Sequence, residues 1–361
     1  MIRSLLASVL LLPALAGFSQ KSDNPMRSAL DKQVDSLVRA AFAREECVGL
    51  VIGVIDGGKT YTWAYGETAL GNGQLPDKNT IFQIGSITKT FTGIMLAAQI
   101  GRGQVKADGL ISQYVPDSVK LKWFDDKPVT MLMLTNHTSA IPRWEPVMKY
   151  PGFNIAQPYA HFQTAQLYHF LNHYEPTEAP GMRYDYSNIA VGLLGELLAR
   201  NAGTTYAQLL EREITRPLKM HDTRITDSPE LPARMAQGYD RGRKTEQPWI
   251  MSALAGAGGI QSTMTDMLKY ARANMEPGNE AFGAAVRLSH QQTFADSNAI
   301  IAMGWHISRV KGHTIVQHGG QTGGYNSYIG VEPAEKKAVI ILSNEAAANQ
   351  VGWPLQMYLT R

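Results

Sequence analysis

A chain of 361 residues, 44% of them hydrophobic, is long enough to bury a large core. We expect one large domain or two closely joined domains. The formal net charge of +3 is small for this length and shows no basic stripe, which argues against nucleic acid as a partner. Cys47 is the only cysteine, and no two of the nine histidines form a His-Glu-x-x-His pair, so neither an internal disulfide nor a metal site is expected.

The N-terminus has the pattern of a secretory signal peptide. Arg3 precedes an apolar run over residues 5–12, and small residues follow at the expected cleavage spacing. The run is too short to span a bilayer permanently, and Phe18 stands where a lipid-modified cysteine would stand. We therefore predict a signal peptide over residues 1–16, cleaved near Ala16, and a secreted or periplasmic protein with no stable membrane anchor.

The elements that follow, in chain order, suggest a sheet built from both termini. Apolar residues at helical spacing predict a helix over residues 29–45, and the runs at 49–55 and 60–65 predict a β-hairpin. From about residue 81 to residue 249 the signals are mostly helix and loop. Further strands are predicted in the C-terminal third, over residues 313–317, 327–331 and 337–342. A final helix is predicted over residues 346–359.

This order predicts an α/β (α+β) fold with a helical insert. We expect residues 25–80 and 250–361 to form an α/β domain, and residues 81–249 to form a mainly helical domain.

The stretch from Phe82 to Met95 holds the first candidate for chemistry. An extended run passes through Gly85, after which apolar residues recur on one helical face. Ser86 is therefore expected at or near the helix N-cap, with Lys89 one turn later on the same face. A buried lysine near the positive end of a helix loses its proton more easily, so Lys89 is a candidate base for a Ser86 nucleophile.

An ordinary helix N-cap followed by a solvated lysine would explain Ser86 and Lys89 equally well. Ser-x-x-Lys is a short pattern, and the chain holds a second copy at Ser308 to Lys311. That copy lies between alternating apolar runs just before Gly312, as is typical of a hairpin turn. The choice at Ser86 therefore depends on partners elsewhere in the chain.

Tyr186-Ser187-Asn188 is the second candidate, on a loop that runs into an apolar helix. A tyrosine near a lysine ammonium can shuttle protons, and Asn188 offers a donor and an acceptor for a substrate amide. The alternative is an ordinary loop with a packed tyrosine and a capping asparagine. The tripeptide is the only Tyr-x-Asn in the chain, which favours a function.

The glycine-rich stretch from His318 to Tyr325 is the third candidate. Such backbone at a strand edge lets a substrate pair as an added strand, and a free N–H there can face a developing oxyanion. A glycine-bulged strand with a surface histidine is the alternative. Thr135 to Ser139 is a weaker candidate, because a helix-ending turn would explain it equally well.

The order Ser-x-x-Lys, Tyr-x-Asn and His-x-Gly resembles the penicillin-recognising serine hydrolases, in particular the branch of class C β-lactamases and low-molecular-weight D-alanyl-D-alanine peptidases. The stretches 135–142, 216–223 and 319–327 resemble this family too. The resemblance implies a β-lactamase/transpeptidase-like fold, with an antiparallel sheet flanked by helices, an all-helical domain and the active site in the crevice between them. It implies no cofactor or metal and a small-molecule or peptide substrate, and it leaves the oligomeric state open.

The resemblance also implies a role for each candidate residue. Ser86 would be the acylated nucleophile and Lys89 its proton partner. Tyr186 would act as general base and acid in acylation and would activate the deacylating water. Asn188 would hold the acylamido side chain of the substrate.

The third motif completes the implied site and departs from many β-lactamases of this branch. His318 would take the place of a lysine, followed by Gly319 and Gly320, and the backbone N–H groups of Ser86 and Gln321 would form the oxyanion hole. A histidine is cationic only part of the time near neutral pH, so we expect a weaker, pH-dependent grip on a substrate carboxylate.

The function expected from the sequence is an exported serine hydrolase that acts through an acyl-enzyme on β-lactams, on D-alanyl peptides or on both. An esterase on the same scaffold remains an alternative. So does a sensor that traps penicillin or peptidoglycan fragments without turnover.

Overall fold

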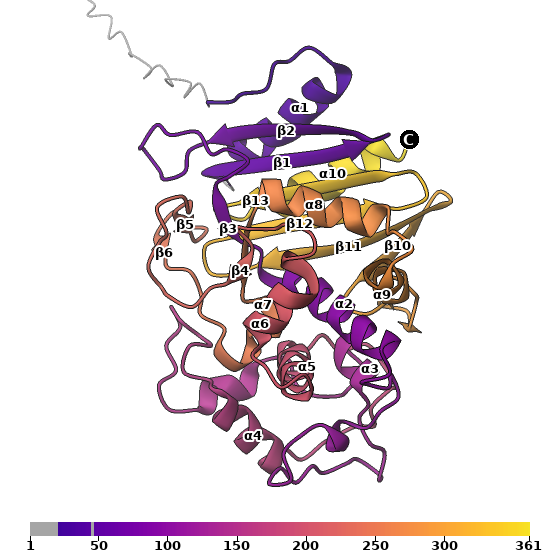
Figure 1. Ribbon diagram of the computed structural model, residues 1–361. Helices are drawn as coiled ribbons and strands as arrows, with labels where there is room; N and C mark the ends of the chain where they lie inside the picture. Colours follow the sequence, from indigo (N-terminus) through magenta and orange to yellow (C-terminus); the bar gives the residue numbers. More distant parts are fainter. Residues whose placement is uncertain (1–20, 45–46) are drawn as a thin grey trace, which may run out of the picture.

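A large antiparallel sheet forms the upper part of the protein in the computed structural model, which describes residues 21–44 and 47–361 (Figure 1). The predicted signal peptide lies outside the described residues. The strand order is β2-β1-β13-β12-β11-β10-β9-β8, and two smaller sheets have the orders β3-β7-β4 and β5-β6. The strands are β1 Gly49–Asp56, β2 Lys59–Gly66, β3 Ile81–Gln83, β4 Arg224–Ile225, β5 Gly238–Tyr239, β6 Thr245–Glu246, β7 Ile260–Thr263, β8 Phe294–Ala295, β9 Ile300–Ile301, β10 His306–Val310, β11 His313–Gln321, β12 Asn326–Glu332 and β13 Lys337–Ser343.

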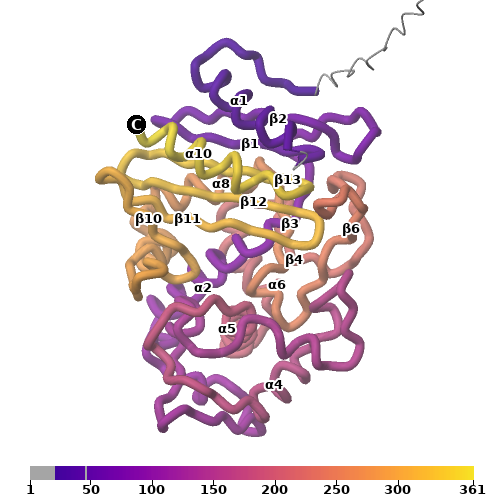
Figure 2. Tube along the Cα trace, turned by 180° about the vertical axis from the view of Figure 1, so that it is seen from behind, coloured from indigo at the N-terminus to yellow at the C-terminus, as the bar shows by residue number. Residues whose placement is uncertain are grey.

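Helices cover both faces of this sheet and also form the lower part of the molecule (Figure 1). Helices α1 and α10 pack against each other beside the sheet, and α8 packs on β1 and β13. Figure 2 shows from behind that α2 lies below β11, with α5 and α4 further down. The helices are α1 Ala29–Ala43, α2 Thr88–Gly101, α3 Met131–Thr135, α4 Thr164–His173, α5 Asn188–Asn201, α6 Tyr206–Leu210, α7 Ala255–Gly258, α8 Met264–Met275, α9 Ala281–Ser289 and α10 Ala348–Leu359.

Strand β1 shows how the sequence sorts residues between the two faces of the sheet. Successive side chains of a strand point to opposite faces. Leu50 and Ile52 accordingly belong to the core shared with α1 and α10, whereas Val51 and Ile55 belong to the larger core that includes α2 and α8. Gly53 lets α8 approach closely, because a Cβ atom there would lie 2.4 Å from the Met264 sulfur.

The expected fold is confirmed, with a sheet built from the N-terminal hairpin and the C-terminal strands. Strand β11 is longer than expected and reaches Gln321, so it includes residues 318–321 of the glycine-rich stretch. The expected domain boundaries near residues 80 and 250 stay a prediction, because one hydrophobic core includes residues from both parts. No helix in the described ranges is long and apolar enough to cross a membrane.

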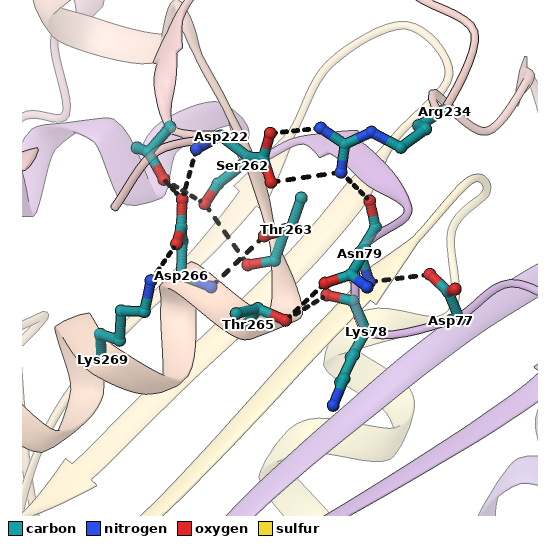
Figure 3. Close-up of polar contacts among 11 residues, drawn as sticks. Asp77, Lys78, Asn79, Asp222, Arg234, Ser262, Thr263, Thr265, Asp266 and Lys269 are labelled. Carbon is teal, nitrogen blue, oxygen red and sulfur yellow. Dashed lines mark hydrogen bonds and ion pairs between the residues drawn. The ribbon is translucent and has the colours of Figure 1, made fainter. Parts of the chain in front are cut away.

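A polar network fixes the segment that leads into β3 (Figure 3). The buried Asp266 carboxylate accepts hydrogen bonds from Asp222 N at 2.8 Å and from Thr223 Oγ1 at 3.0 Å, and it pairs with Lys269 at 2.9 Å. Thr265 Oγ1 donates to the Asn79 side chain at 2.9 Å. Because residue 79 lies just before β3, the start of α8 holds in place the strand that delivers the Ser86 loop.

Candidate active site

Ser86 lies in a 3-10 turn, Gly85–Ile87, between β3 and α2. Ser86 lies near the N-cap of α2, as expected, and one residue before it. Helix α2 begins at Thr88, and its N-cap is Ile87, which already has helical dihedral angles and makes no side-chain cap bond. The Ser86 hydroxyl is therefore not used to cap the helix. It accepts a hydrogen bond from Lys89 Nζ at 3.1 Å.

Lys89 is fully buried and has only neutral hydrogen-bond partners. Besides Ser86, its amine donates to Asn188 Oδ1 at 2.8 Å and to the Ala257 carbonyl at 2.6 Å. It makes no ion pair with any carboxylate of the described residues. Burial lowers the pKa of Lys89 well below its ordinary value, and the charge of Arg143 adds to this effect. Lys89 therefore loses its proton more easily than an ordinary lysine, as expected for a base beside Ser86.

Tyr186, in the loop before α5, and Asn188, the first residue of α5, line the same cavity as Ser86. Ser187, rather than Asn188, caps this helix, because its hydroxyl accepts from Ala190 N at 2.9 Å. The Tyr186 ring centroid lies 4.9 Å from Lys89 Nζ. Burial raises the pKa of Tyr186 above its ordinary value, and a hydrogen bond with Ser86 opposes this rise only in part. The phenol is therefore protonated in the resting site.

The His137 ring packs against the Tyr186 ring, a contact that the sequence did not reveal. Its ring centroid lies 4.3 Å from that of Tyr186, and its Nδ1 accepts a hydrogen bond from Ser187 N at 3.1 Å. The residue has a left-handed backbone with φ of +62°, in the loop that follows α3. His137 belongs to the stretch Thr135 to Ser139, which is only a weak candidate in the sequence. The one signal there is a group of polar side chains after an apolar run.

The third motif lies on an edge of β11 that has no strand partner. Strand β10 begins at His306, which pairs with Gln317, so the pairing with β10 stops before His318. On its other side, β11 pairs with β12 as far as Gln321. Among the described strands, residues 318–321 are therefore open on one side, where an extended substrate could add as a further strand.

His318 differs from the expectation that it is partly cationic near neutral pH. The ring is 3% exposed, and burial lowers its pKa well below the ordinary value, with additional contributions from His306 and Lys89. Its Nδ1 donates to the Gly319 carbonyl at 2.6 Å. His318 is therefore neutral at pH 7, and a substrate carboxylate would meet a dipole here rather than a charge.

The candidate residues described above surround a cavity of about 580 Å³. The predicted site residues other than Lys89 line it: Ser86, Tyr186, Asn188, His318, Gly319, Gly320 and Gln321. The same cavity is also lined by Arg143, Trp144, Tyr159, Tyr184 and Trp249. None of the sequence motifs singled out Arg143.

The match to known proteins agrees with this geometry. The model of the family described as Beta-lactamase matches residues 34–354. The chain belongs to this family. It is 29% identical to a D-alanyl-D-alanine-carboxypeptidase/endopeptidase, AmpH, from Escherichia coli K12, over 86% of this chain and 82% of the relative. It is 26% identical to a Beta-lactamase from Pseudomonas fluorescens, over 88% and 94% of the two chains.

Solved structures of this family have the same fold. A Beta-lactamase/D-alanine carboxypeptidase from Yersinia pestis, complexed with citrate, aligns with a TM-score of 0.76 and 26% identity over 92% of this chain and 99% of that one. A class C beta-lactamase aligns with a TM-score of 0.80 and 24% identity over 92% and 95% of the two chains. The family and fold expected from the sequence are thus confirmed, and the chain is a serine hydrolase of this family.

The Gly85→Ala variant is expected to lose both stability and activity. Gly85 has φ of +48°, and a Cβ atom there would lie 2.6 Å from Gln321 N, so the Ser86 loop would have to move away from β11. Gly57→Ala is the matched control, because φ is +54° and nothing lies within 4 Å. In both variants the free energy of unfolding should fall by about 1 kcal/mol, because alanine is strained in the left-handed backbone conformation. Only Gly85→Ala should also lose hydrolytic activity, and equal activity in the two variants would contradict this account.

Acid is expected to destabilise the protein before its carboxylates are protonated. Burial lowers the pKa of His306 to about 4, whereas an unfolded histidine titrates near 6.5. As the pH falls from 7 to 5, the unfolded chain gains a proton that the folded chain does not bind, which costs about 2 kcal/mol. Urea unfolding at both pH values measures the total loss, to which other buried histidines with a lowered pKa, such as His318, also contribute. His306→Phe should reduce it, and an equal loss in the variant would exclude this cause.

Proposed function

We propose that this serine hydrolase cleaves D-alanyl-type amides, in peptides and in β-lactams, through an acyl-enzyme on Ser86. The observation that carries the proposal is the buried Lys89 amine, 3.1 Å from Ser86 Oγ and without a carboxylate partner among the described residues. In its neutral form the amine has two N–H groups, which are enough for Asn188 Oδ1 and the Ala257 carbonyl, so its lone pair is left to accept the Ser86 proton as a general base.

In this mechanism Ser86 Oγ attacks the scissile carbonyl carbon while its proton passes to Lys89. The backbone N–H groups of Ser86 and Gln321 bind the oxyanion. The Tyr186 phenol gives its proton to the leaving nitrogen and regains one from Lys89, which leaves the acyl group on Ser86 as an ester. Water then attacks this ester, with the Lys89 and Tyr186 pair again moving the proton, and free Ser86 returns.

The raised pKa of Tyr186 favours this assignment over one in which the tyrosine starts as a phenolate. The hydrogen bond from Lys89 Nζ to Asn188 Oδ1 keeps the asparagine at the edge of the site. There its amide group would bind the acylamido group of the substrate.

The neutral His318 supports a second candidate, an esterase on the same scaffold. A site without a fixed positive charge in the third motif has a weaker hold on the carboxylate of a peptide C-terminus or a β-lactam. Initial rates with a chromogenic cephalosporin, a D-alanyl-D-alanine peptide and a short acyl ester separate these activities. The proposal predicts cleavage of the peptide or the cephalosporin. Turnover of the ester alone would support the esterase.

Export is part of the proposal, because the predicted signal peptide would deliver the enzyme to the compartment of such substrates. N-terminal sequencing of the mature protein tests it. A first residue near Gly17 is expected, and an intact Met1 on the active protein would contradict export through this segment.

A further inference from the structure

Arg143 is the only residue with a permanent charge among the described residues that line the cavity. The same lining contains neither Asp nor Glu. His318 is neutral and Lys89 lies beneath the cavity with a lowered pKa, as described above. The electrostatic character of the open cavity is therefore set by one guanidinium group.

This guanidinium group has no polar partner within the described part of the chain. No hydrogen bond or ion pair involves the Arg143 side chain, and its closest defined contact is the Tyr186 ring, whose centroid lies 5.1 Å from Cζ. The neighbouring Glu145 carboxylate accepts instead from Trp144 N at 3.0 Å. An exposed arginine beside a cavity with its fork of N–H donors unused is free to bind an anion.

The backbone fixes where this group lies relative to the reacting atoms. The Arg143 carbonyl accepts hydrogen bonds from Asn188 N at 3.0 Å and from Ile189 N at 3.3 Å, so Arg143 is tied to the start of α5. Asn188 is the residue proposed above to bind the acylamido group. Arg143 therefore lies beside the acyl part of the substrate.

We propose that Arg143 binds a carboxylate on the acyl side of the substrate, so that the site prefers acyl groups that carry a negative charge near the scissile carbonyl. This inference rests on the proposed function, because it assumes that Ser86 receives the acyl group. A guanidinium group binds a carboxylate through two parallel hydrogen bonds, which also orients the acyl group. The preference should weaken as salt is added, because Arg143 is exposed to solvent.

Two penicillins that differ in one carboxylate test this proposal. The probes are phenylacetamido penicillin and α-carboxyphenylacetamido penicillin, and the measured quantity is the second-order rate constant for acylation of Ser86, followed by intact-mass analysis. We expect the wild-type protein to prefer the carboxylated probe by about tenfold, as for a charge-assisted hydrogen bond at a partly exposed site. Arg143→Gln should lower this ratio about tenfold, and Arg143→Lys should keep part of it.

Lys149→Gln is the matched control, since it removes a positive charge from the same segment outside the cavity. Its ratio should equal that of the wild-type protein. An unchanged ratio in Arg143→Gln, with Ser86 still acylated by both probes, would overturn the inference and leave the proposed function standing. Failure of both probes to acylate Ser86 would instead overturn the proposed function, and the inference with it.

Discussion

Replacing Ser86 by alanine is expected to lower kcat by about 10⁴-fold or more, as the loss of a covalent nucleophile does in other serine hydrolases. The hydroxyl oxygen lies 3.1 Å from Lys89 Nζ and faces the cavity, and no other serine lines that cavity among the described residues. Steady-state turnover of the best substrate measures the effect.

Ser308→Ala provides the control for this variant, because Ser308 begins the second Ser-x-x-Lys of the chain. The structure places Ser308 on β10 and Lys311 in the turn that follows, as the sequence predicted. The control should therefore keep wild-type turnover. Activity of Ser86→Ala within tenfold of the wild-type value would contradict the assignment of the nucleophile.

The Lys89→Met variant is expected to lower kcat/KM by about 10³-fold, within the usual range for the loss of a general base. Methionine is a neutral, unbranched side chain and fills much of the buried space, so the variant tests proton transfer more than packing. The wild-type enzyme should become faster as the pH rises through the lowered pKa of Lys89, because the neutral amine is the active form. This rise should be absent in the variant.

Lys311→Met is the corresponding control, since it removes the lysine of the second motif copy. It should retain the wild-type rate and pH profile. The same pH-dependent rise in Lys89→Met and in the wild-type enzyme would show that another group supplies the base.

Much of the fold followed from patterns that act locally. The hairpin around Asp56 and Gly57, the helix after Ser86 and the C-terminal strands all have periodic apolar residues, and each formed with small shifts at its ends. At Ser86 the sequence placed the residue at or near the helix N-cap, and the structure shows that Ile87 continues a 3-10 turn into α2 and is itself the N-cap. Periodicity cannot distinguish a 3-10 turn from the first turn of an α-helix.

The site was only partly predictable, because burial and tertiary contacts decide its chemistry. The motifs gave Ser86, Lys89 and Tyr186 as candidates, and the fold brings these three residues together. The neutral state of His318 depends on neighbours that only the folded chain supplies. The contact of His137 with Tyr186 and the position of Arg143 depend on a left-handed loop and on carbonyl contacts to α5, neither of which leaves a periodic pattern.

Intact-mass analysis after rapid mixing with a chromogenic cephalosporin tests the central claim most directly. The account predicts a transient or lasting increase in mass equal to the acyl group, mapped by peptide digestion to Ser86 and absent in Ser86→Ala. Rapid loss of the adduct would indicate a working deacylation route and β-lactamase activity, and slow loss would indicate a penicillin-binding peptidase. Hydrolysis that proceeds with an unmodified Ser86 under conditions that trap acyl-enzymes would contradict the mechanism.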